Sequence, residues 1–168
     1  PALVKGVDIA AKAIKNLRTS KDLDIKLCIV QSGDFEQTKR CVQDTIGEMP
    51  AWVQLLPPRE DIATYYNAAD VFLSASRTEG LSYATIEAAY CSCGLVCTRI
   101  GGNPLDIPYI GICEKEDVES LCTMLYGQLA LAPDEKEKQS VAQRQYVLSH
   151  YNMEDWLKKI TALYRDLI

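Results

Sequence analysis

Short apolar runs alternate along this chain with longer stretches in which apolar residues recur every three or four positions. The runs lie at 25–30, 52–56, 71–76, 94–98 and 109–113. A run this short and apolar is typical of a buried β-strand. The longer stretches between the runs predict helices at 7–18, 35–46, 60–68 and 82–92. Because strands that alternate with helices form βαβ units, we expect an α/β fold: one Rossmann-like domain with a parallel sheet covered by helices on both faces.

The last third of the chain shows helical patterns only, at 116–131, 134–149 and 153–167. We assign these helices to the same domain, which spans 1–168. The last one has a good start, because Asn152 can cap it and Asp155 follows three residues later, close to a capping box. Its apolar stripe has to pack against something, and it consists of Trp156, Ile160, Leu163 and Leu167.

The first residues, "PALV", form an apolar stub that leads straight into Lys5, Gly6 and a helix. A Rossmann-like unit normally opens with a strand. We therefore expect "ALV" to be the remnant of a truncated first strand or the loop after it. The chain then resembles half of a larger protein.

Composition excludes several classes of protein. A length of 168 residues suits one domain with a real core, and a net charge of −5 without a basic stretch argues against a nucleic-acid surface. No apolar run approaches the length needed to span a bilayer, and no signal peptide is visible. We expect a cytoplasmic protein with at most peripheral contact at the inner face of the membrane.

The seven cysteines are an odd number in a chain that does not need disulfides for stability. Several lie within apolar runs, so we expect small buried side chains in a reducing compartment. The cluster Cys91, Cys93 and Cys97 matches no common zinc spacing, and the single histidine, His150, is far away in sequence. We therefore predict no metal site.

The stretch "VFLSASRTEGLSYATIEAA" holds a predicted strand, a loop and the start of a helix. In open α/β sheets, ligands bind at the carboxyl ends of strands, where helix N-termini present free amides. Gly80 would let the backbone approach a ligand closely. We expect the amides of Leu81, Ser82 and Tyr83 to face outward and, with the helix dipole, to favour a phosphate.

Two glutamates, Glu79 and Glu87, flank the start of this helix. The helix rises about 7.5 Å from Ser82 to Glu87, which is comparable to the distance from a phosphate to the far side of its ribose. Since a carboxylate accepts two hydroxyl hydrogen bonds well, Glu87 would hold ribose hydroxyls and Glu79 the hydroxyls of a sugar. The alternative is structural: Glu79 would offset the helix dipole and Glu87 would lie on a solvated face.

Glu79-x7-Glu87, with Gly80 after the first glutamate and "EAAYCSCGLVCTRIGGNP" from the second, resembles the signature of the large retaining GT-B glycosyltransferase family, group 1 or family 4. Four more segments fit the family in order: "VKGVDIAAKAIKNL", "IKLCIVQSGD", "LLPPREDIATYYNAADVFLSAS" and "YNMEDWLKKITALYRDL". The resemblance implies two Rossmann-like domains facing each other across a cleft. This chain would be the C-terminal one, which binds the nucleotide-sugar donor, and its closing helix would cross to the acceptor-binding N-terminal domain.

The resemblance also implies roles for individual residues. Lys5 would neutralise the donor diphosphate, together with an arginine six residues earlier that lies before the start of this chain. Glu79 would contact the donor sugar, Glu87 the ribose, and the amides of Gly80, Leu81, Ser82 and Tyr83 the phosphates. The loop from Leu56 to Arg59 would meet the base, with Pro57 and Pro58 as a rigid turn in the alternative, and Ser32 and Gly33 would make a weaker donor contact.

The chain departs from the family pattern at a few positions. Ser92 and Gly94 stand where the family has glycine and then proline, which reshapes the helix end. Ser82 stands where glycine is common, so we expect its hydroxyl to join the phosphate contacts. Of the pair Gly101 and Gly102, we expect one to be a plain turn.

The implied function is that of a hexosyltransferase-type glycosyltransferase that works with retention. It would move a sugar from a nucleotide diphosphate sugar to a saccharide or lipid-linked acceptor, in glycan or polysaccharide biosynthesis. Lys5 and the amides would stabilise the leaving diphosphate without a divalent metal. Alone, this half would bind the donor weakly and transfer nothing.

Two alternatives stay open. A GT-B-shaped sugar-nucleotide epimerase would share the nucleotide site but needs more acid and base groups than one histidine supplies. A non-catalytic nucleotide-sugar-binding or interaction module would keep the fold, although the presence of both glutamates, Gly80 and Lys5 speaks against it.

Overall fold

The computed structural model describes residues 2–31 and 34–166. Its helices are α1 (Val7–Lys21), α2 (Phe35–Ile46), α3 (Ala63–Ala68), α4 (Tyr83–Tyr90), α5 (Val118–Leu129), α6 (Pro133–His150) and α7 (Met153–Asp166). Its strands are β1 (Leu27–Val30), β2 (Val53–Leu56), β3 (Val71–Ser74), β4 (Gly94–Thr98) and β5 (Gly111–Cys113). Each predicted helix and strand is present, so the alternation of apolar patterns predicted the element order correctly.

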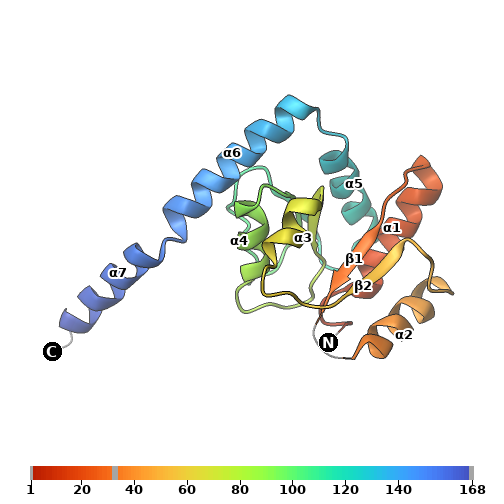
Figure 1. Cartoon of the computed structure of the whole chain (residues 1–168), viewed down its shortest axis with the longest axis horizontal. Coiled ribbons are helices and arrows are strands. Elements are labelled where there is room, and N and C mark those ends of the chain that lie inside the picture. The colour runs from red at the N-terminus through yellow and green to blue at the C-terminus, as the bar shows by residue number, and fades with distance from the viewer. Residues whose placement is uncertain (1, 32–33, 167–168) are drawn as a thin grey trace.

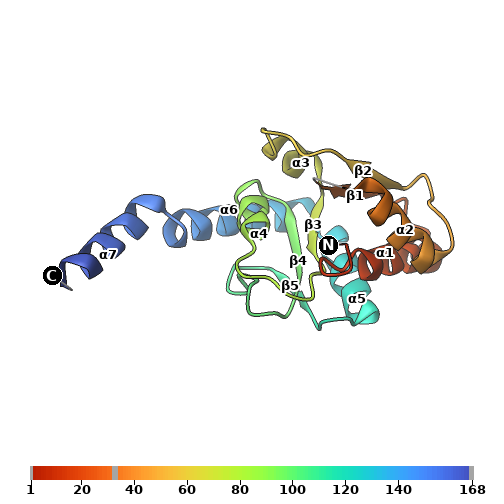
Figure 2. The ribbon, with the colours of Figure 1, turned by 90° about the horizontal axis from the view of Figure 1, so that it is seen from below.

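The strands pair in parallel, as predicted, but they form two sheets instead of one. β1 pairs with β2, and the second sheet has the order β3-β4-β5. Figure 2 places the β1–β2 pair on the β3 side of the larger sheet. In a dinucleotide-binding fold, a further parallel strand lies in space between the positions that β1 and β3 occupy here, and it makes the sheet continuous.

Residues 2–5 form a turn and not that strand. The carbonyl of Val4 accepts a hydrogen bond of 2.8 Å from the amide of Arg77, just beyond the carboxyl end of β3. The segment "ALV" is therefore a turn in this structure.

The larger sheet lies between two helical layers (Figures 1 and 2). On one face, α1 and α5 pack against it through a cluster that includes Ile14, Val96 and Leu121. On the other face, α4 and α6 enclose a second cluster around Leu95 and Ile107. Helices thus cover both faces of this sheet, as the sequence predicted.

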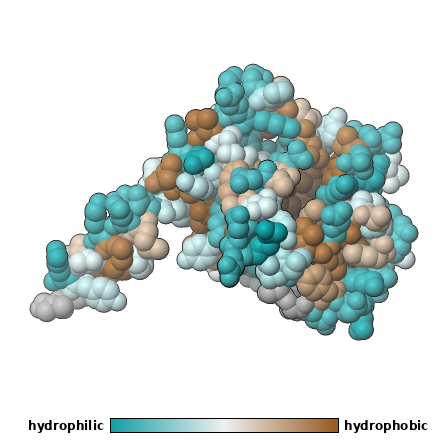
Figure 3. Space-filling model, in the orientation of Figure 1, coloured by the Kyte–Doolittle hydropathy of each residue, from teal (hydrophilic) through white to brown (hydrophobic). Residues whose placement is uncertain are grey.

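The smaller sheet is covered on one face only. Val42 of α2 and Ala11 of α1 are fully buried against this face, where they join one cluster with Val53 of β2. On its other face, Cys28 and Gln54 are exposed. Figure 3 shows apolar surface over β1 and β2 in this region.

Helix α7 projects away from the rest of the chain as the end of an arm formed with α6 (Figure 1). The predicted cap is present, since Oδ1 of Asn152 accepts from the amide of Glu154 at 2.8 Å. Trp156 is 56% exposed and Leu163 is 54% exposed. Within the described residues, the apolar stripe of α7 therefore lacks the packing partner we expected; Leu167 lies outside them.

All seven cysteines are free thiols. Cys93, Cys97 and Cys113 are buried, and burial raises the pKa of Cys97 to about 12 and that of Cys113 to about 11. These three confirm the prediction of small buried side chains. Cys28 is exposed and does not fit it.

Candidate functional site

The site forms at the carboxyl end of β3, where the turn before α1 meets the loop before α4. Nζ of Lys5 donates to Oε1 of Glu79 over 2.6 Å, across 74 positions of sequence. Ser76 donates its hydroxyl to the same oxygen at 2.7 Å. The structure therefore brings together two residues that the sequence could join only through a family resemblance.

The carboxylate of Glu79 is largely shielded, with a side chain that is 14% exposed. Burial raises the pKa of this carboxyl, but the bonds from Lys5 and Ser76 lower it further than burial raises it, so that the pKa lies below its ordinary value of 4.5. Glu79 is thus held ionised. Both bonds use Oε1, and Oε2 has no hydrogen-bond partner among the described residues.

The start of α4 differs from the prediction at Ser82 and Tyr83. The amide of Ser82 donates to the carbonyl of Gly102 at 2.8 Å, and that of Tyr83 to the carbonyl of Leu81 at 3.0 Å. The hydroxyl of Ser82 is buried against the hydroxyl of Thr85, 2.8 Å away. Our expectation that these two amides and the Ser82 hydroxyl face a phosphate is wrong, because protein groups already satisfy them.

Other amides at this helix start remain open. The amides of Gly80, Leu81 and Ala84 have no hydrogen-bond partner within the part of the chain that the structure describes. A Cβ added at Gly80 would meet nothing within 4 Å. The backbone at Gly80 is therefore approachable, and Leu81 and Tyr83 have exposed side chains beside it.

The loop that holds Glu79 rests on the loop after β4. A Cβ added at Gly102 would lie 2.1 Å from the carbonyl oxygen of Glu79, whereas one added at Gly101 would meet nothing within 4 Å. As predicted, only one of the two glycines has a role beyond a plain turn. Beneath them, Nδ2 of the buried Asn103 donates to the carbonyl of Thr98 at 2.9 Å, which fixes the loop on the sheet.

Glu87 lies on the exposed face of α4, about one turn after the helix begins at Tyr83. Its Oε2 accepts a 3.0 Å hydrogen bond from the hydroxyl of Tyr66 in α3. Burial, followed by this hydrogen bond, raises the pKa of Tyr66 above its ordinary value. The hydroxyl therefore stays protonated and orients one oxygen of Glu87, and Oε1 has no partner among the described residues.

Arg59 lies in the loop after β2, with its guanidinium 5.8 Å from the centre of the Tyr65 ring. The hydroxyl of Tyr65 donates to the carbonyl of Pro57 at 3.1 Å, so α3 also braces this loop. The two consecutive tyrosines link the loop of Arg59 to Glu87. Ser32 and Gly33 lie outside the described residues.

Sequence reasoning missed the residues that support the site. Tyr66 was assigned to a helix without a role, and Arg77, which binds Asp8 through a bidentate ion pair, was not singled out at all. The partners of these contacts are 21 and 69 positions apart. Only the position of Arg77, two residues before Glu79, offered any signal.

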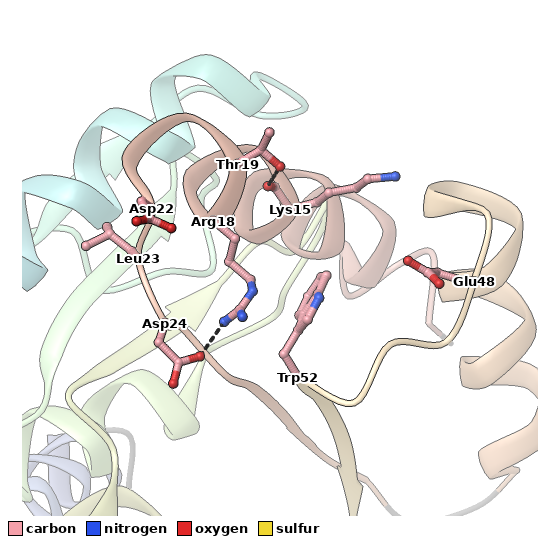
Figure 4. Close-up of a pocket in the computed structure, with 8 residues that line it drawn as sticks. All are labelled: Lys15, Arg18, Thr19, Asp22, Leu23, Asp24, Glu48 and Trp52. Carbon is pink, nitrogen blue, oxygen red and sulfur yellow. Dashed lines mark hydrogen bonds and ion pairs between the residues drawn. The ribbon is translucent and has the colours of Figure 1, made fainter.

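A pocket of about 440 Å³ lies elsewhere, at the C-terminal end of α1 (Figure 4). Arg18 bonds to Asp24 there at 2.9 Å, and its guanidinium lies 5.7 Å from the centre of the Trp52 ring. Since α1 has 15 residues, its two ends are separated by about 22 Å. This pocket is therefore separate from the site at Lys5, and none of its lining residues was predicted.

Comparison with known proteins decides the family. The family "Glycosyl transferases group 1" matches residues 2–125, which include the paired Lys5 and Glu79 and the Glu87–Tyr66 contact. This chain belongs to that family. The match covers α1 to α5 up to Leu125 and leaves α6 and α7 outside it.

The relatives of this group 1 glycosyl transferase chain are longer than the chain itself. It is 28% identical over 159 residues to the GDP-mannose-dependent alpha-(1-6)-phosphatidylinositol monomannoside mannosyltransferase of Mycolicibacterium smegmatis, covering 88% of this chain and 41% of that protein. A glycosyltransferase from Rickettsia africae superimposes with a TM-score of 0.85 at 21% identity, over 97% of this chain and 44% of the other. The chain thus spans less than half the length of these relatives.

A third comparison extends the fold to a solved structure with a ligand. The structure "Trehalose-6-phosphate from E. coli bound with UDP-2-fluoro glucose" superimposes with a TM-score of 0.78 at 12% identity, over 95% of this chain and 41% of that chain. Two of the solved neighbours are named as glycosyltransferases, and this group 1 chain shares their α/β fold.

None of the described helices is both long and apolar enough to cross a membrane. Among the described residues, no group of three or more histidine, cysteine or acidic side chains is placed to hold a metal ion.

Proposed function

We propose that this chain is the nucleotide-sugar donor domain of a retaining hexosyltransferase. The observation that supports it most is the contact between Lys5 and Glu79, which places a cation and a carboxylate side by side at the open start of α4. A sugar diphosphate requires both groups: a cation for its phosphates and a hydrogen-bond acceptor for its sugar hydroxyls.

Lys5 binds the diphosphate in this proposal without leaving Glu79. An ammonium group has three donors, and Glu79 uses one of them in the described structure. Lys5 is 59% exposed, so its other donors are accessible. The open amides of Gly80, Leu81 and Ala84 would add to the phosphate contacts, in place of the amides of Ser82 and Tyr83.

Glu79 orients the donor sugar. Its Oε2 is the oxygen without a protein partner, and its charge is maintained by Lys5 and Ser76. An ionised carboxylate there accepts hydroxyl hydrogen bonds and stabilises positive charge that develops on the sugar ring during transfer. Lys5 and the open amides stabilise the departing diphosphate, and no step in this scheme uses a divalent metal.

Glu87 holds the ribose hydroxyls, because Tyr66 fixes one of its oxygens and leaves the other for a ligand. Arg59 and the loop from Leu56 to Arg59 meet the base. The Mycolicibacterium smegmatis relative is named for a GDP-sugar, and the E. coli structure was solved with a UDP-sugar. The base of the donor is therefore left to the experiment.

The acceptor, a saccharide or lipid-linked saccharide in glycan biosynthesis, would bind mainly to a second domain across the cleft. The length difference to the relatives supports this division. We propose that the chain by itself binds donor weakly and does not transfer sugar, as a cytoplasmic domain with at most peripheral membrane contact.

Calorimetric titration of the chain with UDP-, GDP- and ADP-sugars tests the proposal. One of the three should bind, and Lys5→Met and Glu87→Gln should each weaken it about tenfold, which corresponds to about 1.4 kcal/mol. Glu137→Gln is the matched control, since Glu137 is exposed on α6 and distant in sequence from the site. Binding of none of the three sugars would instead favour a non-catalytic interaction module.

A further inference from the structure

Arg77 connects three segments of the chain around the site. Its guanidinium forms a bidentate ion pair with Asp8 of α1, with Nη1–Oδ1 at 2.9 Å and Nη2–Oδ2 at 2.8 Å. Nε donates to Glu116 at 3.0 Å, and Nη1 also donates to the carbonyl of Leu3. The amide of Arg77 donates to the carbonyl of Val4 at 2.8 Å. One residue thus holds the turn before α1, the first turn of α1 and the segment before α5.

These contacts flank Lys5 closely. Leu3 and Val4 precede it, Asp8 follows it, and on the opposite side Arg77 is two residues from Glu79. The side chain of Lys5 is mostly exposed, and a long exposed side chain has a large entropy to lose when it is held in one place. Its position beside Glu79 therefore depends on how firmly its backbone is held.

A second contact fixes the same backbone. Gly6 has φ of 69°, and a Cβ there would lie 1.9 Å from the carbonyl oxygen of Ala75 at the end of β3. The turn thus rests directly on the strand that leads to Arg77 and Glu79. Because Gly6 has no Cβ, the turn can lie this close to the strand.

We propose that Arg77 is a positioning residue: its bidentate ion pair with Asp8 locks the turn of residues 2–6 onto the loop of residues 76–80, and thereby keeps Nζ of Lys5 on Glu79. The pair is suited to this because it is partly shielded, with side chains that are 26% and 16% exposed. Planar, two-bond geometry fixes orientation as well as distance, which a single lysine contact would not do. That the Lys5–Glu79 pair then serves a diphosphate rests on the function proposed above.

A double-mutant cycle in which the pKa of Glu79 is measured tests directly whether the Arg77–Asp8 pair positions Lys5. In the otherwise unchanged chain, Lys5→Met should raise the pKa of Glu79, followed by NMR of its labelled carboxyl carbon. In the Asp8→Asn background, the same Lys5→Met change should leave that pKa unmoved, because Lys5 has already left Glu79. Comparing the two backgrounds cancels the direct effect of the missing Asp8 charge.

Two further backgrounds complete the cycle. Arg77→Lys keeps the charge but loses the two-bond geometry, so it should also reduce the effect of Lys5→Met, and it replaces Asp8→Asn if that variant does not fold. Glu114→Gln removes a nearby exposed acid that pairs with Arg99 and does not bind Arg77, so there the effect should persist. An undiminished effect of Lys5→Met in the Asp8→Asn and Arg77→Lys backgrounds would overturn the proposal.

Nucleotide binding separates this inference from the proposed function. With UDP, GDP and ADP as probes, Asp8→Asn should weaken the best binder about as much as Lys5→Met does, about tenfold. If none of the three nucleotides binds, the proposed donor-binding function is wrong. The pKa measurements on the variants still decide whether Arg77 positions Lys5. If a nucleotide binds and Asp8→Asn leaves its affinity unchanged, the positioning role is wrong and the function stands.

Discussion

Gly102 lies so close to the backbone of Glu79 that a Cβ on it would fall 2.1 Å from the Glu79 carbonyl oxygen and 2.6 Å from the Glu79 Cβ. Since backbone atoms cannot yield as a flexible side chain does, Gly102→Ala has to push the loop of Glu79 outward. We expect it to lower the free energy of unfolding by about 1–3 kcal/mol, the usual cost of overpacking, as measured by urea denaturation. It should also weaken nucleotide binding.

Gly101→Ala is the matched control for this substitution. It adds the same methyl group one residue away, where nothing lies within 4 Å, and we expect no loss of stability or binding. Equal effects of the two substitutions would show that the contact with Glu79 is not what makes Gly102 important.

The two glutamates of the site should separate in steady-state kinetics of a full-length enzyme that contains this domain. Glu79→Ala should lower kcat about 100-fold, because Glu79 would act on the sugar in the transition state. Glu87→Ala should mainly raise KM for the donor, about tenfold, because the ribose does not react. Small and equal effects of the two substitutions would contradict these assignments.

Glu79 should make the free energy of unfolding depend on pH in the acidic range. Its folded-state pKa is below the ordinary 4.5, so its contribution is fully present above that value and is lost as the pH falls through the folded pKa. Because Lys5 is largely exposed, we expect the contribution to be on the order of 1 kcal/mol or less.

Urea denaturation of the chain and of Glu79→Gln, at neutral pH and at several values below 4.5, checks this expectation. The stability difference between the two proteins should shrink on acidification. Asp8 has a lowered pKa as well, so the Glu79→Gln variant should itself still lose some stability in acid. A constant difference across the pH range would argue against an ionised Glu79 held by Lys5.

Tyr66→Phe should release Glu87 without disturbing the core. The substitution removes the hydroxyl that donates to Oε2 of Glu87 and keeps the ring that packs edge-on against Phe72. We expect stability to change by no more than about 1 kcal/mol and nucleotide affinity to fall several-fold, measured by titration. Tyr90→Phe, at the other end of α4, serves as the control and should leave affinity unchanged.

Removal of α7 should leave the rest of the domain intact. The side chains of this helix are mostly exposed, and among the described residues it shares no substantial contact with another helix or strand. A chain that ends after Tyr151 should therefore unfold within about 0.5 kcal/mol of the complete one, as measured by urea denaturation. A larger loss would mean that the apolar stripe of α7 packs against the domain in solution.

The sequence predicted this fold well where local patterns decide it. The runs at 94–98 and 35–46 became β4 and α2 with unchanged bounds, because their apolar spacing and the capping Asp34 act locally. The division into two sheets was not predictable, since apolar runs specify strands but not which strands become neighbours.

The sequence pointed to the charged residues of the candidate site but not to its hydrogen bonds. Lys5, Glu79 and Glu87 were identified by the family pattern, and the structure does bring Lys5 to Glu79. The amide of Ser82 was expected to be free, but the carbonyl of Gly102 occupies it. No local pattern around Ser82 reveals a contact that depends on how a later loop folds back.

The break between the two sheets divides the proposed site between two bodies. The loop of Arg59 follows β2, whereas Glu79 follows β3, and no ladder of backbone hydrogen bonds joins these strands in the described chain. Side chains of α1 pack against both sheets and hold them together. In the proposed complex, the base of the nucleotide contacts the loop after β2 and its phosphates contact the loop after β3. The nucleotide would therefore bridge the two sheets, and its length would limit how far they can move apart.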